Sequence, residues 1–286
     1  MLWILLPAFN EEKALSTLIP KINTLFQSKS TDYRLVVVND GSTDRTLEIL
    51  NEFIKSSRYP LHILSHKINR GLGETERDGF EFIAENASRT DVVVRLDSDD
   101  THEPTYVFDL VKKLNEGFDV VNTSRFQPGG SQMGVNNYRT LMSYCANVFM
   151  RLIFQIPGVR DYSCGFRAYR ASVIQDALSL WGNSFIQLKG LGFTSTLEML
   201  VKLKLLGCTF AEVPFTLRYD QKPSESKMVS SITTLGYIIM AICYHWPMGG
   251  WRSVYKNIRK SKPEERAMAI QKFRSQKRQK TLFVQH

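Results

Sequence analysis

The segment Val92-Val93-Val94-Arg95-Leu96-Asp97-Ser98-Asp99-Asp100 joins an apolar run to an acidic turn. A continuous β-branched run is typical of a strand that is buried on both faces of a parallel sheet. Three carboxylates follow within four residues, and they repel one another unless a cation is present. The i, i+2 spacing points Asp97 and Asp99 to the same side of an extended chain. The segment therefore predicts a buried strand that ends at an acidic site.

Two roles are open for this acidic turn. Hard oxygen ligands suit Mg²⁺ or Mn²⁺, which typically takes one or two carboxylates together with substrate phosphate oxygens. The alternative is a solvated turn that caps the next helix. The spacing alone does not choose between them.

The surrounding sequence alternates strand and helix patterns through about residue 125. Strands are expected at Leu2–Leu6, Tyr33–Val38, Leu61–Leu64, Asp91–Leu96 and Asp119–Asn122. Helices are expected at Glu11–Phe26, Thr43–Phe53, Gly73–Ala87 and Thr105–Leu114. This order predicts an α/β fold with a mostly parallel central sheet and helices on both faces.

The alternation breaks in the second half of the chain. We expect a loop at Arg125–Gly134, one or two helices at Asn136–Phe154, a short strand at Cys164–Arg170, a helix at Phe193–Leu206 and a strand at Thr209–Val213. In open α/β sheets, ligands bind outside the carboxyl ends of the strands. Those ends carry Pro7–Glu11, Asn39–Gly41, Asn69–Gly73 and Asp97–Asp99. Polar and glycine-rich residues thus fall where a nucleotide would bind.

Two further features narrow the class of ligand. Asp40 could contact a nucleobase or ribose, or it could belong to a simple turn, while Asp44 starts the next helix as a cap. The chain has neither a Gly-x-Gly-x-x-Gly motif nor a Walker loop, which disfavours dinucleotide-dependent dehydrogenases and P-loop NTPases. A sugar nucleotidyltransferase would share the architecture, but its glycine-rich opening is also absent.

The net charge of +9 is concentrated at one end of the chain. Residues 251–280 hold eleven Lys and Arg against two acidic residues, so the rest of the chain is neutral. A nucleic-acid-binding protein should carry basic residues across its folded domain as well, so we expect no nucleic-acid partner. The four cysteines form no CxxC pair, and the first residues have no basic segment or cleavage site of a secretory signal. A reducing, cytoplasmic setting is expected.

Four segments, in this order and spacing, resemble the family 2 glycosyltransferases. They are Pro7-Ala8-Phe9-Asn10-Glu11, Val37-Val38-Asn39-Asp40-Gly41-Ser42-Thr43-Asp44, Asn69-x-Gly71-x-Gly73 and Asp97-Ser98-Asp99, with Asn39 where that family more often has Asp. The resemblance implies the GT-A fold, a Rossmann-like arrangement. It makes Asp97-Ser98-Asp99 the Asp-x-Asp metal motif, with Asp97 and Asp99 as ligands of Mg²⁺ or Mn²⁺.

Later segments are similar to the polyprenol-phosphate (dolichol-phosphate) mannosyltransferases. They are Asp97–Pro104, Thr123–Phe126, Gly129-Gly130, the helix positions Arg139, Ser143, Asn147 and Arg151, and Asp161–Tyr169. Of the family's Arg-x-x-Gly-x-Ser-Lys pattern, Ser226-Lys227 is present, while Gln221 and Ser224 replace the Arg and the Gly. Arg218 and Lys222 are the candidates to replace the missing arginine. The donor sugar is left open.

The resemblance implies an inverting, metal-dependent transfer from a GDP- or UDP-linked sugar to a polyprenyl or dolichyl phosphate. Asp99, Arg125 and Arg139 are the expected catalytic residues. Contacts to the donor and acceptor are expected from Pro7, Ala8, Asn10, Glu11, Asp40, Gly71, Asp97, Ser98, Ser143 and Lys227. The alternative is a saccharide or other hydroxyl acceptor, which would need a catalytic base; Glu198 is the nearest lone carboxylate. Arg151 and Arg167 could equally be structural.

The last part of the chain predicts a membrane-facing element. Residues 1–227 are expected to form the catalytic domain and residues 228–286 an amphipathic helix with a basic tail. Met228–Trp246 carries one apolar stripe with a polar back, and it is short for a membrane span. Trp246, Trp251 and Tyr255 would lie at the headgroups, and the tail would meet anionic lipids. The protein is therefore expected on the cytoplasmic face of a membrane, although a helix packed on the domain would also fit.

Overall fold

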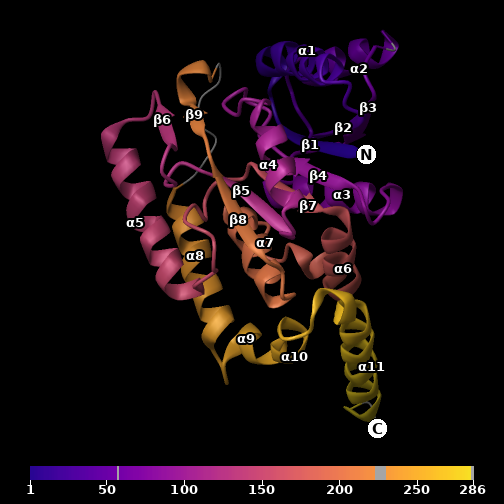
Figure 1. Ribbon diagram of the computed structural model, residues 1–286, viewed down its shortest axis with the longest axis vertical. Coiled ribbons are helices and arrows are strands. Elements are labelled where there is room, and N and C mark those ends of the chain that lie inside the picture. The colour runs from indigo at the N-terminus through magenta and orange to yellow at the C-terminus, as the bar shows by residue number, and fades with distance from the viewer. Residues whose placement is uncertain (57, 223–229, 285–286) are drawn as a thin grey trace.

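A seven-stranded, mostly parallel sheet forms the centre of the protein (Figure 1). The computed structural model describes residues 1–56, 58–222 and 230–284. The strand order is β3-β2-β1-β4-β7-β5-β8, and a separate two-stranded sheet pairs β6 with β9. Only β7 runs antiparallel to its neighbours in the large sheet. The predicted α/β fold class is confirmed.

The elements follow one another in the expected alternation. The strands are β1 (Leu2–Ala8), β2 (Tyr33–Asn39), β3 (Leu61–Ser65), β4 (Val92–Arg95), β5 (Val120–Ser124), β6 (Ser131–Met133), β7 (Arg167–Arg170), β8 (Phe210–Pro214) and β9 (Thr216–Arg218). The helices are α1 (Glu12–Ser28), α2 (Thr46–Lys55), α3 (Leu72–Asn86), α4 (Tyr106–Asn115), α5 (Asn137–Phe154), α6 (Ala171–Trp181), α7 (Thr194–Leu205), α8 (Ser230–His245), α9 (Gly250–Val254), α10 (Lys256–Arg259) and α11 (Arg266–Val284).

Side chains of β1 alternate between two hydrophobic cores. Trp3 and Leu5 face the core that α3, α6, α7 and α8 help to form, whereas Ile4 and Leu6 face the core under α1 and α4. Successive strand residues point to opposite faces, so a strand that is apolar at every position must be covered on both sides. The continuous apolar runs in the sequence have this cause.

Three elements differ from the sequence prediction. The strand expected at Cys164–Arg170 begins only at Arg167, and helix α6 follows it directly, where none was predicted. The region after residue 125, expected to be a loop, contains β6, which pairs in parallel with β9. Both strands are three residues long and pair with each other, so their formation depends on a contact between distant segments.

Helix α8 is packed on the domain along one side and exposed along the other. Met240 and Tyr244 are buried in the same core as α7, and Thr233 is also buried. On the opposite side, Leu235 and Ile242 are about half exposed. The helix is therefore apolar on two sides, and the expected polar back is wrong. The predicted boundary at residue 227 lies outside the described residues.

Much of the basic segment after α8 is part of the fold. Arg266 is buried and pairs with Asp119 at 3.1 Å, and Ile270 of α11 joins the core beside α6. Trp251 and Tyr255, expected at lipid headgroups, instead pack partly buried against that core, while Trp246 is exposed. The prediction of a freely exposed tail is wrong for these residues. Within the described ranges, no helix combines the length and apolar content needed to cross a bilayer.

Candidate active site

A cavity of about 1060 Å³ lies at the carboxyl ends of β1, β2 and β4 and extends between α5 and α8. This is the place at which open α/β sheets bind ligands. The cavity brings together most of the residues predicted from the sequence: Pro7, Ala8, Glu11, Asp40, Gly71, Asp97, Ser98, Asp99, Arg125, Arg139 and Ser143. Segments more than a hundred residues apart in the chain thus share one site.

Asp97 is held by a buried guanidinium. Arg95, the last residue of β4, places Nη1 at 2.6 Å from Asp97 Oδ1 and Nε at 2.8 Å from Glu76 Oε1 on α3. Glu76 also accepts a hydrogen bond from the Ser195 hydroxyl of α7 at 2.7 Å. Desolvation opposes ionisation of Asp97, but Arg95 and the other neighbouring groups, Lys222 among them, together lower the pKa of that carboxyl. Asp97 therefore stays charged at the cavity wall.

Asp99 is engaged at both oxygens. Oδ1 accepts from the Thr101 hydroxyl at 2.6 Å, and Oδ2 contacts the Lys222 ammonium. Burial would lower the pKa of Lys222, but Asp99 and then Asp97 raise it. Asp100, by contrast, does not line the cavity and pairs with Lys21 at 3.4 Å. Two of the three carboxylates in the acidic turn therefore face the site.

The carboxylates of Asp97 and Asp99 could supply part of the coordination shell of a divalent cation. The described residues contain no cluster of three or more acidic, His or Cys side chains that could hold a metal ion. An ion at these two carboxylates would thus complete its coordination with substrate oxygens, as Mg²⁺ and Mn²⁺ commonly do. Asp99 would exchange the Lys222 ammonium for the ion.

His102 supports the same turn from the core side. Its Nδ1 accepts a hydrogen bond from the Asp97 backbone N–H at 3.1 Å, and its ring stacks on Phe166 with centroids 5.1 Å apart. Burial lowers the pKa of His102, which favours a neutral ring. With Nδ1 accepting, the proton of the neutral ring sits on Nε2, which faces Asp97 Oδ2 at 3.5 Å.

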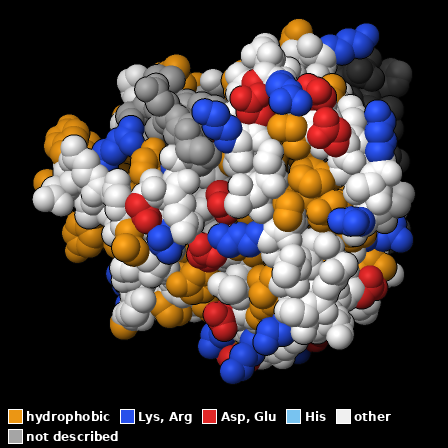
Figure 2. All heavy atoms as spheres, turned by 90° about the horizontal axis from the view of Figure 1, so that it is seen from above, with side chains coloured by type: hydrophobic (Ala, Val, Ile, Leu, Met, Phe, Trp, Pro, Cys, Tyr) orange, Lys and Arg blue, Asp and Glu red, His pale blue; other side chains and the backbone are white. Residues whose placement is uncertain are grey.

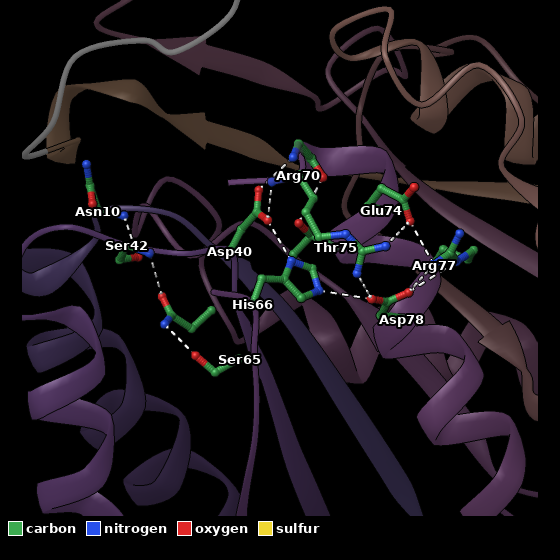
Figure 3. A network of polar contacts seen from close by, with 12 residues as sticks. Asn10, Asp40, Ser42, Ser65, His66, Arg70, Glu74, Thr75, Arg77 and Asp78 are labelled. Carbon is green, nitrogen blue, oxygen red and sulfur yellow. Dashed lines mark hydrogen bonds and ion pairs between the residues drawn. The ribbon is translucent and has the colours of Figure 1, made fainter. Parts of the chain in front are cut away.

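Asp40 lies at the end of β2 and anchors the neighbouring loop. Its carboxylate accepts from the backbone N–H groups of Arg70 and Gly71, each at 2.8 Å, and from His66 (Figure 3). The positive φ of Gly71, 87°, lets the loop turn toward this carboxylate. Asp44 accepts from the Thr46 N–H at 3.0 Å, but Arg45 occupies the N-cap position of α2, so Asp44 holds the turn before the helix and the predicted cap is wrong.

Two predicted binding residues are not placed in the cavity. Asn10 does not line it; with a φ of 52°, Asn10 joins β1 to the next turn by accepting from the Thr43 N–H at 2.8 Å. A short polar side chain suits that left-handed backbone conformation, so Asn10 has a structural role here: it holds the turn after β1. Ser226 and Lys227 lie outside the described residues.

Two arginines line the far end of the cavity. Arg125 donates from Nε and Nη2 to the two oxygens of the buried Asp161, at 2.8 and 2.9 Å. Burial opposes the charge of Asp161, but Arg125 prevails and lowers the pKa of that carboxyl. Arg139 on α5 is exposed and donates to the Tyr219 hydroxyl at 3.2 Å. Arg125 is thus fixed, whereas Arg139 can reach an incoming ligand.

The remaining candidates are outside the cavity. Arg167 is fully buried and donates to the Tyr162 carbonyl at 2.9 Å, which confirms its structural alternative. Arg151 is exposed near the end of α5. Glu198, the candidate base, is fully buried, pairs with Lys202 and accepts from the Leu188 N–H at 2.8 Å. A role for Glu198 as catalytic base is therefore wrong.

Sequence reasoning missed three basic residues in and around the site: Arg95, His66 and Lys189, of which the last lines the cavity and pairs with Glu74. For Arg95 a signal was available, because a charged residue inside an otherwise apolar buried strand needs a partner. Lys222 was named as one substitute for the family arginine, and it is the one that contacts Asp99. Arg218 pairs instead with the exposed Asp220 at 2.9 Å.

Comparison with known sequences gives a family match. The sequence profile of glycosyl transferase family 2 matches residues 3–178. The chain is similar to the dolichol-phosphate mannosyltransferase of Pyrococcus furiosus, with 30% identity over 226 residues, 79% of this chain and 58% of that protein. It is 26% identical over 172 residues to the polyprenol monophosphomannose synthase of Mycolicibacterium smegmatis, which covers 60% of this chain and 62% of that protein. The chain thus spans about three fifths of these relatives.

Comparison with solved structures supports the same fold. Glucosyl-3-phosphoglycerate synthase from Mycobacterium tuberculosis, crystallised with Mn²⁺, UDP and glucosyl-3-phosphoglycerate, superposes with a TM-score of 0.54 at 20% sequence identity. The match covers 85% of this chain and 78% of that one. The central sheet therefore has the GT-A arrangement that the sequence resemblance implied.

Gly165 lies against the buried guanidinium of Arg95. A Cβ at Gly165 would lie 2.1 Å from Arg95 Nη1, and Arg95 is held in place by Glu76 and Asp97. Gly165→Ala should therefore lower the free energy of unfolding by about 1–3 kcal/mol. Gly190→Ala is the matched control, because a Cβ there meets nothing within 4 Å. Chemical denaturation of both variants measures the difference, and equal stabilities would contradict the proposed constraint.

Proposed function

The chain belongs to glycosyl transferase family 2, and we propose that it transfers a sugar from a nucleotide-diphosphate sugar to a polyprenyl-type lipid phosphate. One observation carries the proposal: a single cavity joins the carboxylates Asp40, Asp97 and Asp99 to the cations Arg125 and Arg139. The names of the two relatives described above contain dolichol phosphate and polyprenol monophosphomannose, which supports the acceptor class.

The donor lies at the acidic end of the cavity in this proposal. Asp40 recognises the nucleoside, and Asp97 and Asp99 hold a divalent ion, Mg²⁺ or Mn²⁺. When bound, such an ion supplies Lewis-acid stabilisation of the departing diphosphate. The Lys222 ammonium, which contacts Asp99, adds a second positive charge beside the diphosphate. A GDP-linked and a UDP-linked donor are both compatible with these groups.

The acceptor lies at the arginine end. A phosphate monoester is already anionic at neutral pH, so its oxygen can attack the anomeric carbon without a catalytic base. A new C–O bond forms as the bond to the diphosphate breaks on the opposite side, the nucleoside diphosphate leaves, and the configuration inverts. Arg125, fixed by Asp161, and Arg139 would position the acceptor through charge-assisted hydrogen bonds. The hydroxyl-acceptor alternative loses support because Glu198 is buried away from the cavity.

The surface around the cavity mouth suits a lipid substrate. Helix α5 exposes Tyr138, Leu141, Met142 and Leu152 by half or more, and Tyr138 and Met142 also line the cavity. Exposed side chains of α8 extend this apolar surface: Ile232, Leu235, Ile238 and Ile242. Seen from above, hydrophobic side chains project at the margin where Figure 1 places α5 (Figure 2). We define the exposed apolar side chains of α5 and α8 as the α5–α8 face.

The α5–α8 face would lie on an anionic membrane. Arg252, Lys256 and Lys260 follow α8 and are exposed, so positive charge accompanies the apolar surface. Apolar insertion and attraction to acidic headgroups together hold interfacial helices on bilayers. In this arrangement residues 1–227 supply the catalytic groups, and residues 228–286 add the membrane surface while sharing the core. The proposed location is the cytoplasmic face of a membrane.

Replacing one metal ligand tests the donor site. Asp99→Asn should reduce transfer by at least about a hundredfold, because the loss of one ligand removes several kcal/mol of leaving-group stabilisation. Asp97→Asn should be nearly as severe. Asp100→Asn is the matched control, because this neighbouring carboxylate does not line the cavity. Transfer is measured with Mg²⁺ and with Mn²⁺, and circular dichroism checks the fold. Normal turnover by Asp99→Asn would contradict the metal assignment.

Removing the exposed arginine tests the acceptor site. Arg139→Ala should raise the KM for a polyprenyl phosphate about tenfold and leave the KM for the nucleotide sugar nearly unchanged, since one charge-assisted hydrogen bond to the phosphate is lost. Arg151→Ala on the same helix is the control, because Arg151 does not line the cavity. Steady-state kinetics with both substrates measures the effect. A water-soluble sugar that is accepted as well as any lipid phosphate would refute the proposed acceptor.

Polar substitutions on α5 test the membrane surface. Leu141→Gln combined with Leu152→Gln should weaken binding to anionic liposomes at least about tenfold, because two side chains lose their apolar insertion energy. Leu47→Gln combined with Ile54→Gln is the control, since these side chains are also exposed but belong to α2. Co-sedimentation at low and high salt gives the readout. Equal binding by both double variants, or binding indifferent to lipid charge, would overturn the docking proposal.

A further inference from the structure

His66, the residue after β3, is placed between two carboxylates. Its side chain is 7% exposed, with Nδ1 at 2.6 Å from Asp40 Oδ1 and Nε2 at 2.9 Å from Asp78 Oδ2. Figure 3 shows the ring spanning the gap between Asp40, at the end of β2, and Asp78 on α3. The imidazole thus links the donor-site carboxylate directly to the helix behind it.

The partners of Asp40 and Asp78 require both to be acceptors. Asp40 accepts hydrogen bonds from the backbone N–H groups of Arg70 and Gly71, each at 2.8 Å. Asp78 accepts hydrogen bonds from Arg77 Nη2 at 2.6 Å and from Arg70 Nη1 at 2.8 Å. Burial would raise the pKa of Asp78, but the hydrogen bond and charge of Arg77 lower it. Both groups are therefore carboxylates, without a proton to donate to the ring.

A neutral imidazole has a single N–H and can donate to only one of these carboxylates. Both short contacts are hydrogen bonds only when the ring is an imidazolium with two N–H groups. Arg70 also joins the two carboxylates, through its backbone N–H to Asp40 and its Nη1 to Asp78, and other charges surround the network. Glu74 of α3 pairs with Arg77 at 2.7 Å and with Arg70 at 3.0 Å, and it also contacts Lys189. Arg77 further approaches Glu81 at 3.7 Å.

Asp40 retains capacity for a ligand while it is held in this way. A carboxylate has about four acceptor positions, and Arg70, Gly71 and His66 occupy three of them. The remaining acceptor position is on Oδ2, which accepts a hydrogen bond only from the Gly71 N–H among the described residues. A nucleobase N–H would be a suitable donor to it. The orientation of Asp40 thus depends on the neighbours that share its other lone pairs.

We propose that His66 is a positioning residue for the donor site that acts only as an imidazolium, so that nucleotide affinity falls as the pH rises. The inference rests on the proposed function, since it takes Asp40 as a nucleoside contact. In the imidazolium form, His66 ties Asp40 to Asp78 and so to α3. Loss of one proton leaves a ring nitrogen and a carboxylate oxygen facing each other as two acceptors, so His66 then holds only one of Asp40 and Asp78.

Binding of UDP and of GDP with Mg²⁺, measured by calorimetry at about pH 6 and about pH 8.5, tests this inference, because only a ring with two N–H groups can donate to both carboxylates. His66→Gln is a neutral replacement that can donate to one carboxylate only. At the lower pH it should bind the nucleotide about tenfold more weakly than the unmodified protein, and at the higher pH the two should bind alike. His62→Gln, in β3, is the matched control and should keep the original pH dependence.

Asp78→Asn provides a second test that does not remove the histidine. The new amide can donate to Nε2 of a neutral ring, which leaves the Nδ1 proton for Asp40. This variant should bind nucleotide equally well at both pH values after correction for the ionisation of the nucleotide, which His66→Gln reports. Weak binding by Asp78→Asn at both pH values would overturn the inference, because the charge of Asp78 would then be needed for other reasons.

The outcomes separate this inference from the function on which it rests. If the unmodified protein binds UDP or GDP and His66→Gln shows the same pH dependence, the role of His66 is refuted while the donor site stands. If neither nucleotide binds at either pH, both the proposed function and the role of His66 fall. Circular dichroism at both pH values confirms that each variant is folded.

Discussion

A buried guanidinium between two carboxylates holds the centre of the molecule together. Arg95 ends the central strand β4, and its charge is compensated by Glu76 on one side and Asp97 on the other. An unpaired charge at this depth would cost several kcal/mol, so α3 and the acidic turn must close on Arg95 in one register. Ser195 adds α7 to the same network, and Gly165 leaves the space that the guanidinium fills.

The same principle is repeated around the cavity. Three carboxylates in and around the site each have a cationic partner: Arg95 beside Asp97, Lys222 beside Asp99, and Arg125 beside the buried Asp161. Charges that are fixed in advance need little reorganisation when a charged substrate arrives, which is the basis of electrostatic preorganisation. The pairs therefore serve the fold and the proposed chemistry with the same contacts.

Local patterns in the sequence were sufficient for most of the fold. Apolar runs, helical spacing and the polar ends of strands predicted β1 to β5 and placed Asp97 and Asp99 at the site. The position of Arg95 in an apolar strand signals that it needs a partner, but only the folded chain brings Glu76 to Arg95 and Thr43 to Asn10, so these contacts were not predictable. The exposed apolar side of α8 was predicted, whereas its packing on the domain was only the alternative, because a helix that is apolar on two sides gives no single stripe.

The cavity changes in character along its length, and this gradient explains how one site could serve two unlike substrates. At the ends of β2 and β4 it is lined by fixed carboxylates and tight backbone turns, which suit a nucleotide and its ion. Toward α5 and α8 the lining becomes aromatic and aliphatic, with Tyr138, Met142 and Tyr237 near Arg139. A lipid phosphate needs this combination, because its chain seeks apolar contact while its headgroup seeks a cation. The two substrates would thus meet where the apolar lining and the charged lining adjoin, and neither would have to leave the environment that binds it.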